Sequence, residues 1–284
     1  MNSGTPPRRI IVCADDFGLS PGVNRAILQL IKLRRINATS VMTVAPAFDR
    51  EAASALQRAA GESDCQIGLH LTLTAPFRPL TMHFRHLQND TFRPLPKLLG
   101  ASLTRRLDRE MMASEILAQL AAFKTMFGRP PDYVDGHQHV QAFPQIRDAF
   151  LEAVAVAAPN AWVRQCGRAP GAKRSARDLK SLTLDILSAG LRARAARIGV
   201  SFNPAFAGAY DFSKQPDFAK LFGEFLERLP DGGLVMCHPG FVDDMLVALD
   251  PLTTQREREY EFLASDRLPA LLAERNIALV SGKS

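Results

Sequence analysis

Two adjacent aspartates, Asp15 and Asp16, follow an apolar run in the segment ADDFGLS. The run at 10–13, IIVC, is typical of a buried strand, and charge is costly to remove from water. Two carboxylates at the end of such a strand therefore need a partner that balances their charge. A metal ion can balance one aspartate, and the other can then accept a proton from a water molecule that the ion activates.

A histidine lies within a strictly alternating segment, IGLHLTLT, at residues 67–74. Alternation places the aliphatic side chains on one face and puts Gly68, His70, Thr72 and Thr74 on the other. We expect the aliphatic face to contact helices and the second face to line the interior of a sheet or barrel. His70 is then either a structural imidazole bonded to a backbone carbonyl or part of a site.

The segment DGHQH adds a carboxylate and two more imidazoles. Residues two apart in a strand share a face, so we expect Asp135, His137 and His139 to point inward together. Both histidines can bind a metal, or one can bind while its neighbours hold the site in place, because a metal-bound histidine usually donates its other N–H to a carboxylate or carbonyl. Two incidental histidines at a polar strand end are the alternative.

The elements that must position these residues alternate between strands and helices. The strands are predicted at 9–16, 39–46, 65–73, 133–140, 161–166, 200–204, 233–239 and 277–282. The helices are predicted at 21–34, 48–60, 107–127, 144–157 and 175–198. Repeated strand-then-helix units predict a parallel sheet. Seven or eight such units predict an α/β fold, a TIM-like distorted (β/α) barrel in a single domain over 1–284, with 1–8 as a flexible N-terminal tail.

Titratable residues recur at the predicted strand ends, where the active sites of such barrels lie. They are Asp15, Asp16, His70, His137, His139, Arg164 and His238. The loop at 75–103 contains four prolines and is too long for an ordinary connection, so we expect it to form part of a site wall.

Composition limits the function classes. The 284 residues are 46% hydrophobic, which allows a sizeable core, and the net charge of +6 suits an anionic partner or scattered surface lysines and arginines equally well. We expect no nucleic-acid partner. The basic segment 168–197 either recognises an anionic part of a substrate or is a solvated face. No signal peptide or membrane-spanning run is present, so we expect a cytoplasmic protein. We expect membrane contact only if the substrate is lipid-linked. A homo-oligomer is possible.

The motifs ADDFGLS, GLHLT, DGHQHV and a late HPG, in this order, resemble the YdjC-like carbohydrate deacetylases over residues 8–282. Those proteins are similar to the NodB-type polysaccharide deacetylases in barrel fold and chemistry. The resemblance implies one divalent metal ion, zinc or magnesium, held by Asp16, His70 and His137, with Asp15 as the base. Some members have HxHxH in the third motif, and this chain has Gln141 in place of the last histidine.

The reaction implied is hydrolytic removal of the N-acetyl group from an amino sugar, which is an oligosaccharide, a sugar phosphate or a lipid-linked sugar. Asp15 takes a proton from water, and His238 protonates the departing amine. We expect Arg164 to pair with Asp15 and keep it ionised. Supporting or substrate-binding roles are expected for Asp135, His139, Arg164, Gly208 and Tyr210.

Two other functions fit parts of this pattern. Two histidines and one carboxylate also form the ligand set of non-haem Fe(II) oxygenases, although the sequence contains no HxD pair. A non-catalytic sugar-binding barrel is the second alternative, although a binding protein has no need for the second aspartate.

Overall fold

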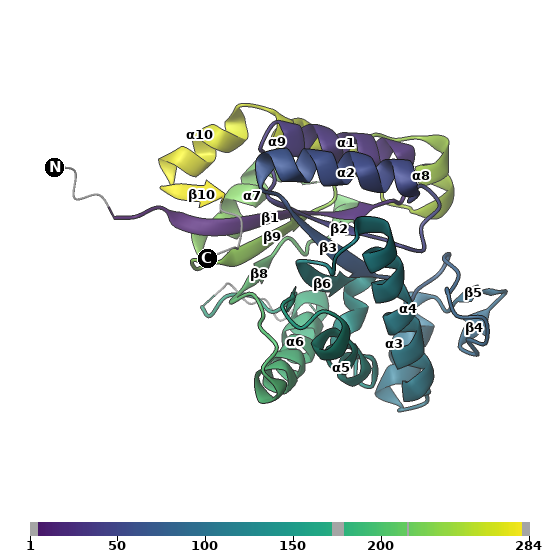
Figure 1. Cartoon of the computed structure of the whole chain (residues 1–284). Helices are drawn as coiled ribbons and strands as arrows, with labels where there is room; N and C mark the ends of the chain where they lie inside the picture. The colour runs from purple at the N-terminus through teal and green to yellow at the C-terminus, as the bar shows by residue number, and fades with distance from the viewer. Residues whose placement is uncertain (1–4, 172–178, 215, 280–284) are drawn as a thin grey trace.

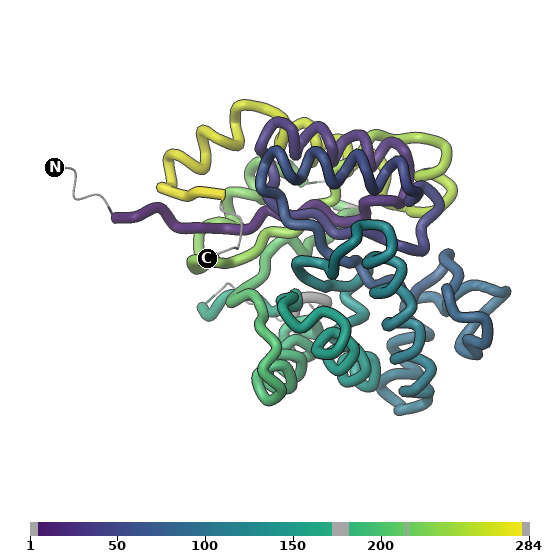
Figure 2. Tube along the Cα trace, in the orientation of Figure 1, coloured from purple at the N-terminus to yellow at the C-terminus, as the bar shows by residue number. Residues whose placement is uncertain are grey.

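The computed structural model describes residues 5–171, 179–214 and 216–279, which fold around a curled parallel sheet (Figure 1). Its strands are β1 (Arg8–Phe17), β2 (Ala38–Val41), β3 (Gln66–Leu71), β6 (Tyr133–Gly136), β7 (Trp162–Val163), β8 (Phe206–Ala207), β9 (Gly233–Cys237) and β10 (Ile277–Leu279). The order is β7-β6-β3-β2-β1-β9-β8, and β10 pairs with the beginning of β1. In Figure 2 the yellow segment at β10 runs beside the beginning of the purple β1.

The two edges of this sheet meet at the segment 200–207. Val163 forms a parallel bridge with Phe202, and the Phe206 N–H donates to the carbonyl of Gly167 at 3.0 Å. Phe206 also pairs with Leu234 of β9. The sheet therefore curls into a distorted barrel, which confirms the predicted α/β, single-domain, TIM-like fold.

Helices cover the outside of the strands, with α1, α2 and α9 on one side in Figure 1 and α4, α5 and α6 on the other. Their bounds are α1 (Pro21–Lys32), α2 (Arg50–Ser63), α3 (Leu95–Leu103), α4 (Arg109–Phe127), α5 (Ile146–Ala157), α6 (Leu179–Ile198), α7 (Phe218–Glu227), α8 (Asp244–Leu249), α9 (Thr254–Ala264) and α10 (Arg267–Glu274). Helix α1 begins where an N-cap residue is followed by proline. The Ser20 side chain accepts a hydrogen bond from the Val23 N–H, and Pro21 is the first residue of the helix.

The long connection at 75–103 is more ordered than predicted. It contains a short hairpin, β4 (Leu87–Gln88) with β5 (Thr91–Phe92), followed by α3. The proline at 96, interpreted as a loop former, lies in the first turn of α3, where a missing N–H costs nothing. The buried carboxylate of Glu115 accepts from the backbone N–H groups of Leu80 and Thr81, which ties this connection to α4.

Several predicted boundaries were wrong. The strand predicted at 39–46 ends at Val41, and the one predicted at 200–204 contains only the bridge at Phe202. Arg8, assigned to a flexible tail, is the first residue of β1 and pairs with Ile277, while residues 1–4 lie outside the described part of the chain. The strand predicted at 133–140 ends at Gly136. Among the described helices, none has the length and apolar character needed to cross a membrane.

Candidate metal centre and active site

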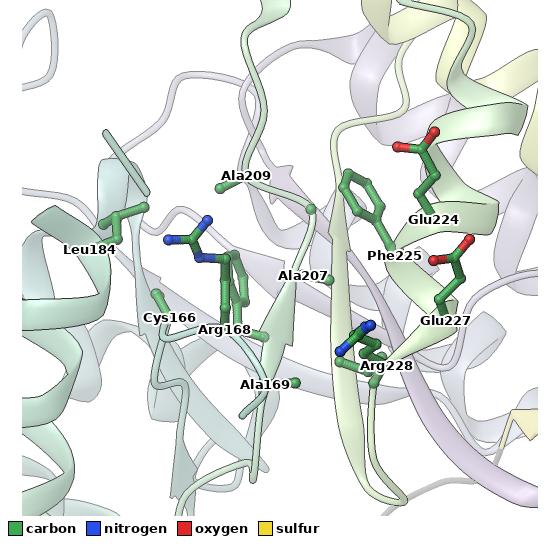
Figure 3. Close-up of a pocket in the computed structure, with 13 residues that line it drawn as sticks. Cys166, Arg168, Ala169, Leu184, Ala207, Ala209, Glu224, Phe225, Glu227 and Arg228 are labelled. Carbon is green, nitrogen blue, oxygen red and sulfur yellow. The ribbon is translucent and has the colours of Figure 1, made fainter. Parts of the chain in front are cut away.

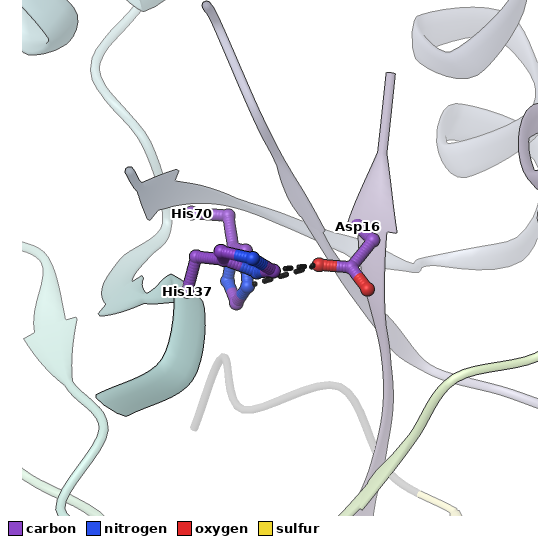
Figure 4. Close-up of side chains that lie close together, drawn as sticks. All are labelled: Asp16, His70 and His137. Atoms are coloured by element: carbon purple, nitrogen blue, oxygen red, sulfur yellow. Dashed lines mark hydrogen bonds and ion pairs between the residues drawn. The ribbon is translucent and has the colours of Figure 1, made fainter. Parts of the chain in front are cut away.

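Three buried side chains, two near the C-terminal ends of β1 and β3 and one directly after β6, converge on one point (Figure 4). Asp16 Oδ1 lies 3.3 Å from His70 Nε2 and 3.1 Å from His137 Nδ1. One ligand atom from each of the three residues lies within 4.8 Å of the others. One carboxylate oxygen and two imidazole nitrogens at this spacing can hold a single metal ion and leave other coordination positions open.

The backbone of β1 explains how neighbouring aspartates serve the same end of the barrel. Asp16 has a left-handed conformation with φ of 70°, and the register between β1 and β2 shifts between Ala14 and Phe17. Neighbours in a regular strand would point to opposite faces, so this irregularity redirects Asp16. The change of direction begins at Asp16 itself, where the left-handed backbone costs about 1–3 kcal/mol.

His137 reaches the cluster from a short 3-10 helix rather than from a strand. This helix, His137–Ala142, begins directly after β6, and Gln138 and His139 have φ values of 55° and 61°. The strand period therefore stops at Gly136, and the expectation that Asp135, His137 and His139 share one strand face was wrong. His139 instead has its Nδ1 atom 3.3 Å from Cys166 Sγ.

Asp135 holds the ring of His70. Its Oδ1 atom lies 2.6 Å from His70 Nδ1, so the other ring nitrogen, Nε2, faces Asp16. This carboxylate–histidine pairing is the common way to fix the orientation of a metal-binding imidazole. Burial by itself lowers the pKa of His70, but the carboxylates of Asp135 and Asp15 outweigh it and raise that pKa to about 10.

Arg164 binds the aspartate that does not face the two histidines. Its Nη1 and Nη2 atoms donate to Asp15 Oδ2 and Oδ1, each at 2.6 Å, and the arginine is fully buried. Burial would raise the pKa of Asp15, but Arg164 and then His70 outweigh it, so the pKa falls below its ordinary value. The predicted pairing of Arg164 with Asp15 is thus present. Gln141 is buried too and donates to the Arg164 carbonyl at 3.2 Å.

A second group of possible ligands, Cys13, Asp15 and Asp135, lies next to the first. Arg164 Nη2 is 2.9 Å from Cys13 Sγ and 2.5 Å from Asp135 Oδ2. The guanidinium therefore already supplies the positive charge of this group. Burial raises the pKa of the Cys13 thiol well above its ordinary value, so the sulfur is a poor metal ligand.

His238 follows β9 directly and lies at the same end of the barrel. Burial lowers its pKa to about 4, and its Nδ1 atom is buried without a hydrogen-bond partner among the described residues. Its backbone N–H donates to Glu259 Oε2 at 2.5 Å, and Glu259 Oε1 accepts from the Tyr210 hydroxyl. Burial raises the pKa of Glu259 to about 7.

These groups line a cavity of about 550 Å³, a size common among small-molecule sites. Its walls include both aspartates of β1, His70, His137, His139, His238, Phe212 and the residues from Asp250 to Arg256. Gly208 and Tyr210, predicted to shape a substrate subsite, are not among its lining residues. The hydroxyl of Tyr210 is used by Glu259, and a Cβ at position 208 would lie 2.3 Å from the carbonyl oxygen of Met236.

A second cavity of about 260 Å³ does have Gly208 on its wall. Figure 3 shows others of its lining residues, among them Leu184 of α6 and Phe225 of α7. Ala209 belongs to the walls of both cavities. Arg168, at the start of the basic segment 168–197, lines the second cavity and pairs with Asp185 at 2.8 Å. The residues 172–178 of that segment lie outside the described part of the chain.

Two charged residues of α9 near the cluster were missed by the sequence analysis. Arg256 is fully buried and donates from Nη2 to Asp16 Oδ2 at 2.7 Å. Glu259 is fully buried behind His238. Both lie in the segment QREREYE at 255–261, whose charge density is typical of a solvated helix face, so the sequence contains no signal for their burial.

The chain is similar to a known family and to known proteins. The family of YdjC-like proteins matches residues 9–274. A protein from Yersinia pestis (strain Pestoides F) named chitooligosaccharide deacetylase is 28% identical over 279 residues, which cover 96% of this chain and 97% of that protein. A solved structure from Enterococcus faecalis V583, described as a proposed cellobiose-phosphate cleavage protein, has a TM-score of 0.72 at 22% identity and covers 96% of this chain and 97% of its own. That likeness establishes the shared fold.

Proposed function

This chain belongs to the YdjC-like family, and we propose that it is a metal-dependent carbohydrate N-deacetylase that hydrolyses the acetamide of an N-acetylated amino sugar. The observation that carries the proposal is the buried cluster of Asp16, His70 and His137 with the ionised Asp15 beside it. The name of the Yersinia pestis relative favours a chitin-type oligosaccharide as the substrate.

The donor set of the cluster fits a divalent metal ion. One carboxylate and two imidazoles suit zinc, and the carboxylate with water would also suit magnesium. The fixed ring of His70 supports this role, because Asp135 leaves only Nε2 free to face the cluster. A divalent ion held there would act as a Lewis acid for the amide carbonyl and would lower the pKa of a nearby water.

Asp15 is the proposed general base. Arg164 keeps it ionised and fixes both of its oxygens, so it can accept a proton from the attacking water without reorienting. Asp15 Oδ2 lies 4.0 Å from His70 Nε2, so the proposed base is close to a proposed metal ligand. A non-catalytic sugar-binding barrel would gain nothing from a buried charge held in this way.

His238 is the proposed group that delivers a proton to the departing amine. With a pKa of about 4 its imidazole is neutral at pH 7, so it does not start as a charged acid. The proton that Asp15 accepts from the attacking water is therefore the one that His238 receives and passes to the amine nitrogen as the C–N bond breaks, which leaves Asp15 ionised and His238 neutral again. The products are acetate and the free amino sugar.

The test is acetate release from N-acetylated chitooligosaccharides by the purified protein. Activity should disappear after treatment with a chelator and return when zinc or another divalent ion is added back. Fully deacetylated oligosaccharides of the same length give the background. Failure to release acetate from any N-acetyl sugar in the presence of each metal would contradict the proposal, and metal-dependent oxygen uptake would favour an oxygenase.

A further inference from the structure

Arg256 is one of the residues that line the cavity, and hydrogen bonds hold its side chain in place. Its Nη2 atom donates to Asp16 Oδ2 at 2.7 Å and to Asp250 Oδ2 at 2.9 Å, and its Nε donates to the Leu252 carbonyl at 3.0 Å. Its own backbone carbonyl accepts from the Gly240 N–H at 3.2 Å. The side chain is fully buried, so these acceptors rather than water fix the guanidinium.

The two oxygens of Asp16 consequently have different partners. Oδ1 faces His70 Nε2 and His137 Nδ1, whereas Oδ2 is occupied by Arg256. An unrestrained carboxylate can bind a cation through one oxygen or through both. We propose that Arg256 is a positioning residue that leaves only Oδ1 of Asp16 available to the metal ion. This inference rests on the metal binding in the proposed function.

The restriction has a chemical consequence. A metal that hydrolyses an amide needs positions for water and for the substrate carbonyl, and a second oxygen from Asp16 would occupy one of them. The positive charge of Arg256 also opposes that of the metal ion, so it weakens metal binding. Arg256 therefore lowers the affinity for the metal ion but keeps one coordination position open. Its removal should tighten metal binding and slow the reaction.

The experiment replaces Arg256 with a neutral residue and uses Co²⁺ alone as the probe. Arg256→Gln and Arg256→Met are both made, so that one remains if the other does not fold. We expect the Kd for Co²⁺ to fall about tenfold. A neighbouring charge shifts the pKa of a carboxyl group by about 1–3 units, and it acts on the binding of a cation in the same sense. We also expect weaker visible absorption from bound Co²⁺, which signals one more ligand.

Two further variants separate positioning from structural support. Arg256→Lys keeps a charged donor for Oδ2 and should keep the wild-type Co²⁺ spectrum. Arg258→Gln makes the same type of change at an exposed position of α9 and should alter neither measurement. Thermal unfolding by circular dichroism confirms that each variant is folded before binding is measured.

An unchanged or increased Kd for Co²⁺ in the folded neutral variants, together with an unchanged spectrum, would overturn the inference. Neither measurement requires turnover, so a failure to find a deacetylation substrate would contradict the proposed function and leave this result standing. Where activity is measurable, the neutral variants should lower kcat at least about tenfold, since the extra ligand blocks a position that the reaction uses.

Discussion

Both oxygens of Asp15 accept hydrogen bonds from Arg164, each at 2.6 Å, and both side chains are almost completely buried. A bidentate pair of this kind fixes orientation as well as charge. Asp16, the next residue, is paired instead with Arg256 and faces two histidines. Each aspartate thus has its own arginine, and the two can perform different functions although they are adjacent.

The different roles proposed for the two aspartates predict different effects of one conservative change. Asp15→Asn should keep the metal and lose about 10²–10⁴ in kcat, the usual contribution of a general base. Asp16→Asn should lose the metal together with the activity, because a ligand oxygen loses its charge. Metal content per chain and kcat are measured for both variants. If Asp15→Asn is the one that loses metal, the two assignments must be exchanged.

Removal of the Arg164 side chain should destabilise the fold strongly. Arg164→Met leaves the buried carboxylates of Asp15 and Asp135 without their cation, and breaking a buried pair in this way costs about 3–5 kcal/mol. The free energy of unfolding in urea measures the loss. The double variant with Asp15→Asn should recover part of it, because one unpaired charge is gone. A loss below about 1 kcal/mol would show that water solvates the two carboxylates after the change.

The convergence of Asp16, His70 and His137 follows from rules that a sequence can carry. Parallel strands bring their carboxyl ends to one edge of the barrel, so polar residues at successive strand ends are brought together. The sequence does not show how sharply the chain turns at those ends. The left-handed backbone at Asp16, Gln138 and His139 is unusual for residues other than glycine, and no local pattern predicts it.

Arg256 and Glu259 show a second limit of sequence interpretation. A helix rich in charge is normally solvated, and burial of two of its charges depends on contacts with distant segments. Arg256 meets Asp16 across 240 residues of chain, and Glu259 meets the backbone of His238. Such pairs become visible only when the packing of α9 against the barrel is known.

The two histidines of the cluster should each be essential for metal binding. His70→Ala and His137→Ala each remove one of the three proposed ligands, and the described residues around the cluster offer no replacement imidazole at that distance. We expect loss of bound zinc in both, measured by metal analysis of the purified variants. His139→Ala, two residues from His137 and paired with Cys166, is the matched control and should retain zinc. Full zinc occupancy in His70→Ala would remove that residue from the ligand set.

Replacement of His238 should discriminate between leaving groups. An amine must be protonated to depart, whereas an activated phenolate does not need a proton. His238→Ala should therefore reduce kcat strongly on N-acetyl sugars and much less on an activated aryl acetate. The ratio of the two losses is the measurement. Equal losses on both substrates would indicate that His238 binds substrate or supports the cavity rather than transferring a proton.

The buried carboxyl of Glu259 predicts how stability varies with pH. Burial raises its pKa to about 7 in the folded protein, against roughly 4.3 for an unfolded glutamate. Between these values the folded state holds a proton that the unfolded state has released, so stability from this group is greatest at low pH. It falls as the pH rises from about 4 to about 7 and is constant above.

Glu259→Gln should remove this dependence, since glutamine does not titrate. The free energy of unfolding of wild type minus that of Glu259→Gln should therefore become more negative between pH 5 and pH 8, by about 1–3 kcal/mol. Glu261→Gln, on the exposed side of the same helix, controls for the substitution itself. The hydroxyl of Tyr210 and the backbone N–H of His238 both donate to Glu259 and favour its charged form. A difference that stays constant with pH would mean that these two donors keep Glu259 ionised throughout.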